Sequence, residues 1–139
     1  MFAKNAVRCY YIITILSVLL WIPYPELSYL LHINSTILAF MSGIGSENVL
    51  LLLVAFAWML IFVVLFVAGI VRAEKCEDYF LIIIVSGFDL LISLFFMLHK
   101  LYLIYVGGFI FIGFLLHTAL YVVVVACVIK ERHKRNRID

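Results

Sequence analysis

Hydrophobic residues fall into long runs that short polar stretches separate. Four runs stand out, over residues 7–22, 49–71, 79–98 and 109–129. A helix that crosses about 30 Å of hydrocarbon at 1.5 Å per residue needs roughly 20 apolar residues, and the last three runs supply them. Lipid offers the backbone no hydrogen-bond partners, and the alternating pattern of a membrane barrel is absent from these runs. The pattern therefore predicts an all-α integral membrane protein with four transmembrane helices in an antiparallel bundle.

The composition agrees with this fold class and excludes soluble ones. Of the 139 residues, 68% are hydrophobic and only 13% are charged. A soluble domain is roughly 45–50% apolar and about 25% charged, and a chain of this size has too little interior to hide the difference. The same excess of apolar residues excludes a disordered chain. We expect one membrane domain over residues 1–139, in which residues 130–139 form a basic cytoplasmic tail.

The first run is the shortest, and it admits two interpretations. It follows Lys4 and Arg8 and ends at Pro23, so it has the basic start and apolar middle of a signal peptide. The small residues of a cleavage site do not follow it, because the next residues read Pro-Tyr-Pro-Glu. We therefore interpret this run as a retained span, with the Arg8 side chain reaching back to the membrane interface.

Lys and Arg residues near the ends of the runs set the orientation, because cytoplasmic loops of membrane proteins carry an excess of both. With the N-terminus inside, only Lys100 of the ten basic residues lies outside. The nine on the cytoplasmic side are Lys4, Arg8, Arg72, Lys75, Lys130, Arg132, Lys134, Arg135 and Arg137. The sequence thus predicts a plasma or inner membrane protein with both termini in the cytoplasm.

The loop over residues 23–48 lies outside in this topology and is rather apolar. Pro25 suits the first position of a helix and Glu26 suits its first turn, so we expect a short interfacial helix here. Such a helix either rests in the headgroups, which we favour, or covers the outer mouth of the bundle. Ser46 is the expected N-cap of the second span. Asn34 begins an Asn-Ser-Thr motif for glycosylation, which is common by chance.

Polar residues share one face in the third and fourth runs. Asp89 lies near the centre of the third, with Ser86 three residues before it and Ser93 four residues after. In the fourth, His117 and Tyr121 are four residues apart. Residues at these spacings share a helix face. A buried charge at this depth costs several kcal/mol, so we expect Asp89 to face the protein interior and find a partner.

Asp89 and His117 are predicted to meet. Asp89 is ten residues from the cytoplasmic start of its run, or about 15 Å, and His117 is 12 residues from the cytoplasmic end of its own, or about 18 Å. A carboxylate beside an imidazole can hold or pass a proton near neutral pH. The alternative is structural: a neutral Asp89 bonded to Ser93 or a carbonyl, and a satisfied core histidine. A polar face also runs along the first span, through Tyr10, Thr14, Ser17 and Trp21.

The tail predicts contact with anionic lipid headgroups, although a plain stop-transfer anchor explains the same charges. Its basic residues are Lys130, Arg132, Lys134, Arg135 and Arg137. Nucleic-acid binding is not expected, because no folded reader accompanies the tail.

The sequence holds no signature of an enzyme, a metal site or a cofactor site. The three cysteines form no CxxC pair, and neither a Gly-rich phosphate loop nor an HExxH motif occurs. His117 is the one histidine well inside a run, whereas haem binding would require two histidines at the same depth in the membrane on facing helices. A hydrolytic triad from Ser86, Asp89 and His117 lacks an evident cavity.

Three functional hypotheses remain. The favoured one is an accessory or interaction subunit of a membrane complex, or a protective membrane factor, because the chain is small and has no soluble domain. The alternative is a small oligomeric transporter or proton-linked carrier that uses Asp89 and His117 near the midplane, with its path between protomers because four helices enclose little space. The third is a holin-like permeabilising protein. The expected partners are the lipid bilayer and either further copies of the chain or a larger membrane protein.

Overall fold

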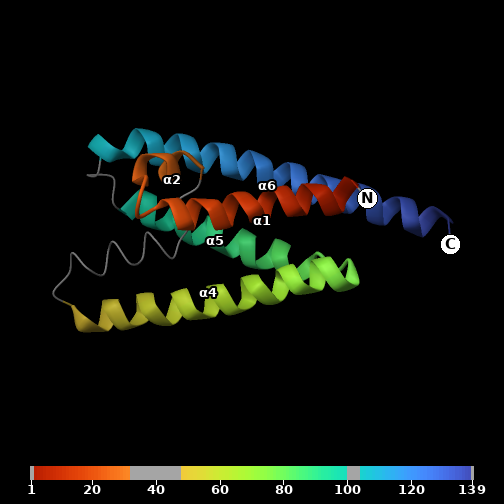
Figure 1. Ribbon diagram of the computed structural model, residues 1–139, viewed down its shortest axis with the longest axis horizontal. Coiled ribbons are helices and arrows are strands. Elements are labelled where there is room, and N and C mark those ends of the chain that lie inside the picture. The colour runs from red at the N-terminus through yellow and green to blue at the C-terminus, as the bar shows by residue number, and fades with distance from the viewer. Residues whose placement is uncertain (1, 32–47, 100–103, 139) are drawn as a thin grey trace.

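The computed structural model describes residues 2–31, 48–99 and 104–138, and the regular structure in these ranges is entirely α-helical (Figure 1). The helices are α1 (Phe2–Leu20), α2 (Pro25–Leu31), α4 (Val49–Cys76), α5 (Phe80–His99) and α6 (Ile104–Ile138). Three segments are long and apolar enough to cross a membrane, namely Phe2–Leu20, Leu52–Cys76 and Phe111–Arg137. A shorter apolar stretch, Phe80–Phe95, lies in α5. The all-α membrane character that the hydrophobic runs predict is therefore present.

Three helices extend several residues past the runs that predict them, and one of these is α4, which ends at Cys76 rather than at residue 71. α1 begins at Phe2 rather than at residue 7, and α6 covers Ile104–Ile138 rather than residues 109–129. The length of an apolar run predicts only the part of a helix that can lie in the hydrocarbon core of the membrane. Lys, Arg and Glu are good helix formers, so the backbone continues as a helix through the basic tail.

The beginning of α4 corrects one prediction. Asn48, not Ser46, is the N-cap, and its side-chain oxygen accepts a hydrogen bond from the Leu50 N–H at 3.1 Å. Both residue types cap helices well, but only Asn48 directly precedes the first helical residue. Ser46, Asn34 and Lys100 lie outside the described residues. At the other end, Glu77 takes a left-handed conformation with φ 52°, which stops α4 and turns the chain into α5.

The helices lie side by side with both termini at one end (Figure 1). α4 packs along α5 and makes a smaller contact with α1, while α1 and α6 pack together. We call this end the termini end; it comprises residues 2–11 in α1, residues 72–80 from the end of α4 to the start of α5, and residues 123–138 in α6. The last turns of α6 extend past the other helices (Figure 1).

The short helix α2 packs against α1 and α6, at the end opposite the termini (Figure 1). It begins at Pro25, as expected. Ser28 is fully buried, and its hydroxyl donates a hydrogen bond to the Ser17 carbonyl at 2.5 Å. A helix that only rested in the headgroup layer would not bury Ser28 against α1 in this way.

The interior changes character along the bundle. Near the termini end it is apolar, with a core that contains Ala3, Val7, Phe66, Ala73, Tyr79, Ile82, Val85 and Val124. Farther from that end, the most deeply buried side chains are polar, and they include Thr14, Ser17, Ser28, Asp89, Ser93 and His117. The apolar part holds the helices together, and the polar part forms the candidate site.

Candidate functional site

Six polar side chains from three helices make up the candidate site. We call this set the polar cluster: Tyr10 from α1, Ser86, Asp89 and Ser93 from α5, and His117 and Tyr121 from α6. Asp89 and His117 are each only 1% exposed, and neither is isolated, since each interacts with a neighbouring group. The structure therefore buries the two ionisable groups that the sequence singled out.

Helix α5 presents its polar residues on one face. Ser86, Asp89 and Ser93 are all buried, as their spacing of three and four residues predicts. The opposite face is apolar and exposed, and it includes Phe88, Leu91 and Phe95. Lipid is the expected neighbour of that face, so the helix is polar inside and apolar outside, the reverse of a helix in a soluble protein.

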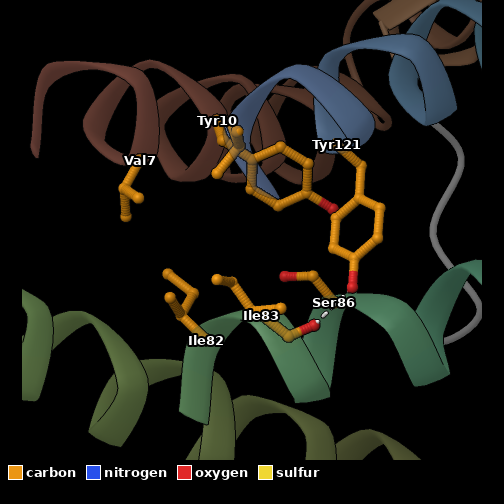
Figure 2. Close-up of a pocket in the computed structure, with 7 residues that line it drawn as sticks. Val7, Tyr10, Ile82, Ile83, Ser86 and Tyr121 are labelled. Atoms are coloured by element: carbon orange, nitrogen blue, oxygen red, sulfur yellow. Dashed lines mark hydrogen bonds between the residues drawn. The ribbon is translucent and has the colours of Figure 1, made fainter. Parts of the chain in front are cut away.

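Two contacts fix the register of α5 against α6. The Tyr121 hydroxyl donates a hydrogen bond to the Ile83 carbonyl at 2.9 Å (Figure 2). A Cβ built on Gly87 would lie 2.8 Å from the Tyr121 hydroxyl oxygen, so the phenol lies level with residues 83–87. The two helices run in opposite directions (Figure 1). Residue 117, one turn before Tyr121 in α6, therefore lies level with the position one turn after residues 83–87 in α5, near residue 89. This register sets His117 level with Asp89; that the two act as a functional pair stays a prediction.

Tyr10 joins the two α6 residues to α1. Its ring centroid lies 4.5 Å from that of His117 and 6.0 Å from that of Tyr121, with tilted planes in both pairs. Such tilted aromatic contacts are favourable and orient both rings. The spacing along the first span predicts that Tyr10 lies on a polar face, but Tyr10 was not among the predicted site residues. The usable signal was its spacing of four and seven residues from Thr14 and Ser17.

The cavity beside Tyr10, Ser86 and Tyr121 is very small. It has a volume of about 10 Å³ and lies between α1, α5 and α6, and Tyr10, Ser86 and Tyr121 line it together with apolar neighbours (Figure 2). One water molecule needs about 10–15 Å³ by the same measure. This cavity therefore has no room for an organic solute.

A second group of polar contacts ties α1 to α4 at the termini end. The Arg8 guanidinium donates two hydrogen bonds to the Glu74 carboxylate, at 2.6 and 2.5 Å. The Tyr11 hydroxyl donates to the same carboxylate at 2.8 Å, and the Lys4 ammonium lies 3.8 Å from it. A bidentate arginine fixes orientation as well as distance, so Glu74 holds three residues of α1 in place. Arg8 thus has a carboxylate partner within the bundle, which snorkelling alone did not predict.

The tail of α6 is also tied to the rest of the bundle. Arg135 pairs with Glu77 at 2.5 Å, and Glu131 accepts a hydrogen bond from the Ala3 N–H at 3.0 Å. The hydrogen bond from Arg135 lowers the pKa of the Glu77 carboxyl below its ordinary value. Arg135, predicted as a lipid contact, therefore has a protein partner. The other four predicted contacts are exposed, namely Lys130, Arg132, Lys134 and Arg137.

The residues that the structure describes contain neither a metal site nor a disulfide bond. No group of three or more His, Cys, Asp or Glu side chains in these residues is arranged to hold a metal ion. Cys9, Cys76 and Cys127 are free thiols. Comparison of the chain with protein-family models, with curated proteins and with solved structures found no match.

Proposed function

We propose that the chain is a four-span membrane protein that acts as an interaction subunit, docking on another membrane protein without catalytic chemistry of its own. In this proposal α1, α4, α5 and α6 all cross the bilayer, and the termini end faces the cytoplasm. The observation that carries it is the closed interior. Asp89 and His117 are buried, and the adjoining cavity has room for about one water molecule. Among the described residues, this cavity leaves no room for a solute to pass between α1, α5 and α6, so we propose that the outer surface of the bundle carries the function.

The outer face of α4 is the surface we propose for docking. α4 lies at the edge of the bundle and packs mainly on α5. Its outer face carries a stripe with spacings of three and four residues, the repeat by which two helices pack along each other. The stripe consists of Leu53, Ala57, Leu60, Val64, Val67 and Val71, all exposed. In a bilayer, helix association depends on such close packing rather than on hydrophobicity, because lipid is equally apolar.

Site-directed photo-crosslinking in native membranes tests this surface. Benzoylphenylalanine replaces Val64 on α4 in one variant and Val122 on α6 in the matched control, two valines of similar exposure, 66% and 59%. We expect one discrete protein adduct from position 64 and none from position 122. The adduct's mass shows whether the neighbour is a second copy of the 16.0 kDa chain or a different protein. The same adduct from both positions, or none from either, would contradict docking through α4.

A proton-linked carrier is the second candidate, and the burial of Asp89 favours it. An ionisable side chain deep in a membrane span is costly and usually serves function. Asp89 is 1% exposed and level with His117, which contacts Tyr10. A carboxyl group beside an imidazole can hold or pass a proton near neutral pH where no larger ion fits.

Proton flux into vesicles that contain the purified chain tests this candidate. If the protein carries protons, an internal pH-sensitive dye will respond to an imposed membrane potential, and Asp89→Asn will reduce the rate to that of protein-free vesicles. Thr14→Ala is the control, because it removes a buried polar group from α1 that lies outside the polar cluster and leaves the carboxyl in place. The absence of flux with the unmodified chain would contradict the carrier. Release of a trapped carboxylated dye would instead favour the holin-like alternative.

A further inference from the structure

We propose that a groove between α1 and α6 at the termini end binds a single anionic glycerophospholipid, with the phosphate at Lys130 and Lys134 and an acyl chain along α6. The proposal rests on the membrane topology proposed above, but not on any protein partner. It differs from general attraction of the tail to a charged surface, because it names one groove, one headgroup class and the apolar floor that selects a lipid.

The groove has an apolar floor and a basic rim. It is open, with a volume of about 690 Å³. Its floor is formed by Val123, Ala126 and Cys127 of α6, and the side chain of Phe2 from α1 stands beside it. Lys130 and Lys134 lie farther along α6. The α6 residues recur at spacings of three and four, so they form one stripe along one face of the helix.

The order of residues along this stripe matches the order of groups in a lipid. Val123 and Lys130 are seven residues apart, or about 10 Å along the helix axis, and Lys134 follows one turn later. α6 has left the predicted apolar run by Lys130, so the two lysines lie where headgroups are, and Val123 lies where acyl chains begin. A free phosphate would use only the lysines and would leave the floor exposed.

The charges around the groove favour an anion. No ion pair or hydrogen bond within the described part of the chain uses the side chains of Lys130 or Lys134. The one acidic residue that lines the groove is Glu131. It accepts a hydrogen bond from the Ala3 N–H at 3.0 Å and lies 3.8 Å from the Arg135 guanidinium, so its charge is largely compensated within the protein. Two ammonium groups that pair with no acidic side chain among the described residues suit a phosphodiester.

Lipid titration of the purified full chain in mild detergent, followed by native mass spectrometry, tests the site. The probes are phosphatidylglycerol and phosphatidylcholine with identical acyl chains. We expect the first phosphatidylglycerol to bind more tightly than phosphatidylcholine. Each lysine near an anionic surface contributes about 1 kcal/mol, so Lys130→Gln with Lys134→Gln should weaken phosphatidylglycerol binding by roughly 25-fold.

Two further variants separate this site from general electrostatics. Arg132→Gln with Lys75→Gln removes the same charge from exposed positions off the groove, and we expect it to change binding by less than about twofold, since no groove contact is lost. Ala126→Trp fills the floor without changing charge and should abolish the tight binding. All of these positions are exposed, so helical content by circular dichroism should stay unchanged in every variant.

Each remaining outcome decides against the proposal. An equal loss in the two charge variants would mean attraction to the tail as a whole. Unchanged binding by Ala126→Trp, or displacement of the lipid by soluble glycerol phosphate, would mean an anion site without an acyl groove. The measurement uses the isolated chain, so its result does not depend on crosslinking through α4. A failed docking test leaves the lipid site standing, and a failed lipid test leaves docking through α4 standing.

Discussion

At the scale of single residues, the polar cluster is held by contacts between helices rather than within them. Tyr121 reaches across from α6 to the Ile83 carbonyl of α5, and it passes directly over Gly87. That carbonyl already accepts the bond that its own helix provides, so the phenol uses its second lone pair. The absence of a Cβ at position 87 makes room for the hydroxyl, and the glycine is therefore explained by packing rather than by backbone conformation.

Gly87→Ala tests this explanation in a double-mutant cycle with Tyr121→Phe. Alanine in a helix interior is favoured over glycine by about 0.5–1 kcal/mol. In the unmodified chain the new Cβ would meet the Tyr121 oxygen at 2.8 Å, so the hydroxyl must move and its hydrogen bond, worth about 1 kcal/mol, is lost. We expect Gly87→Ala to be nearly neutral alone and stabilising with Tyr121→Phe, measured as free energies of unfolding in mixed micelles. Equal effects in both backgrounds would contradict the contact.

The sequence predicted the site residues that are related by their spacing along a single helix. Asp89, Ser86 and Ser93 follow from helical spacing and from the cost of a charge in lipid, and so does the depth of His117. The contact of Tyr10 with His117 did not follow, because it depends on how α1 rotates and shifts against α6. A single sequence holds no periodicity that reports this relation. The pairing of Arg8 with Glu74 was missed for the same reason.

At the scale of elements, the apolar runs located the helices better than they located the helix ends. α4 and α5 begin within one residue of their runs. Asn48 caps α4, and the Asp78 side chain accepts a hydrogen bond from the Phe80 N–H at the start of α5 at 3.1 Å. α6 instead continues beyond its run to Ile138, where no apolar pattern marks the end. The ion pair between Arg135 and Glu77 joins this extended end of α6 to the turn after α4.

The pair between Arg135 and Glu77 predicts a dependence on pH. The pKa of Glu77 is lowered in the folded chain, so the pair stabilises the fold above the ordinary glutamate pKa of about 4.3. The stabilisation is lost as the pH falls through the lowered pKa. Arg135→Gln should therefore lower the unfolding temperature by the same amount from pH 8 to pH 5, and the difference should vanish in stronger acid. Arg132→Gln is the control, and a difference that grows on acidification would contradict the pair.

At the scale of the whole molecule, the arrangement of the helices agrees with the distribution of charge. The N-terminal part of α1, the C-terminal parts of α4 and α6 and the start of α5 lie at one end (Figure 1). The acidic residues of this end, Glu74, Glu77, Asp78 and Glu131, are all paired with basic residues or a backbone N–H. Several basic residues remain without an acidic partner in the described chain, Lys130 and Lys134 among them. The positive-inside rule predicts that such an end faces the cytoplasm.

Cysteine labelling in oriented membrane vesicles tests this topology. Cys76 ends α4 at the termini end and is exposed, and Asn48 is exposed at the other end of the same helix. In a chain whose other two cysteines are serine, we expect a membrane-impermeant maleimide to label Cys76 only from the cytoplasmic side. Asn48→Cys in a cysteine-free background should react only from the opposite side. The control is permeabilised vesicles, in which both positions should react.

The two labelling positions bracket 28 helical residues, or about 42 Å at 1.5 Å per residue, which exceeds the 30 Å of hydrocarbon. Opposite accessibility therefore means that α4 crosses the bilayer. α1 and α6 meet α4 at the same end, so the orientation of one helix then fixes that of the others. Labelling of both positions from one side would mean that α4 does not cross, and it would remove the basis for docking through its outer face. Opposite accessibility with Cys76 outside would keep the bundle but would move the lipid groove to the other leaflet.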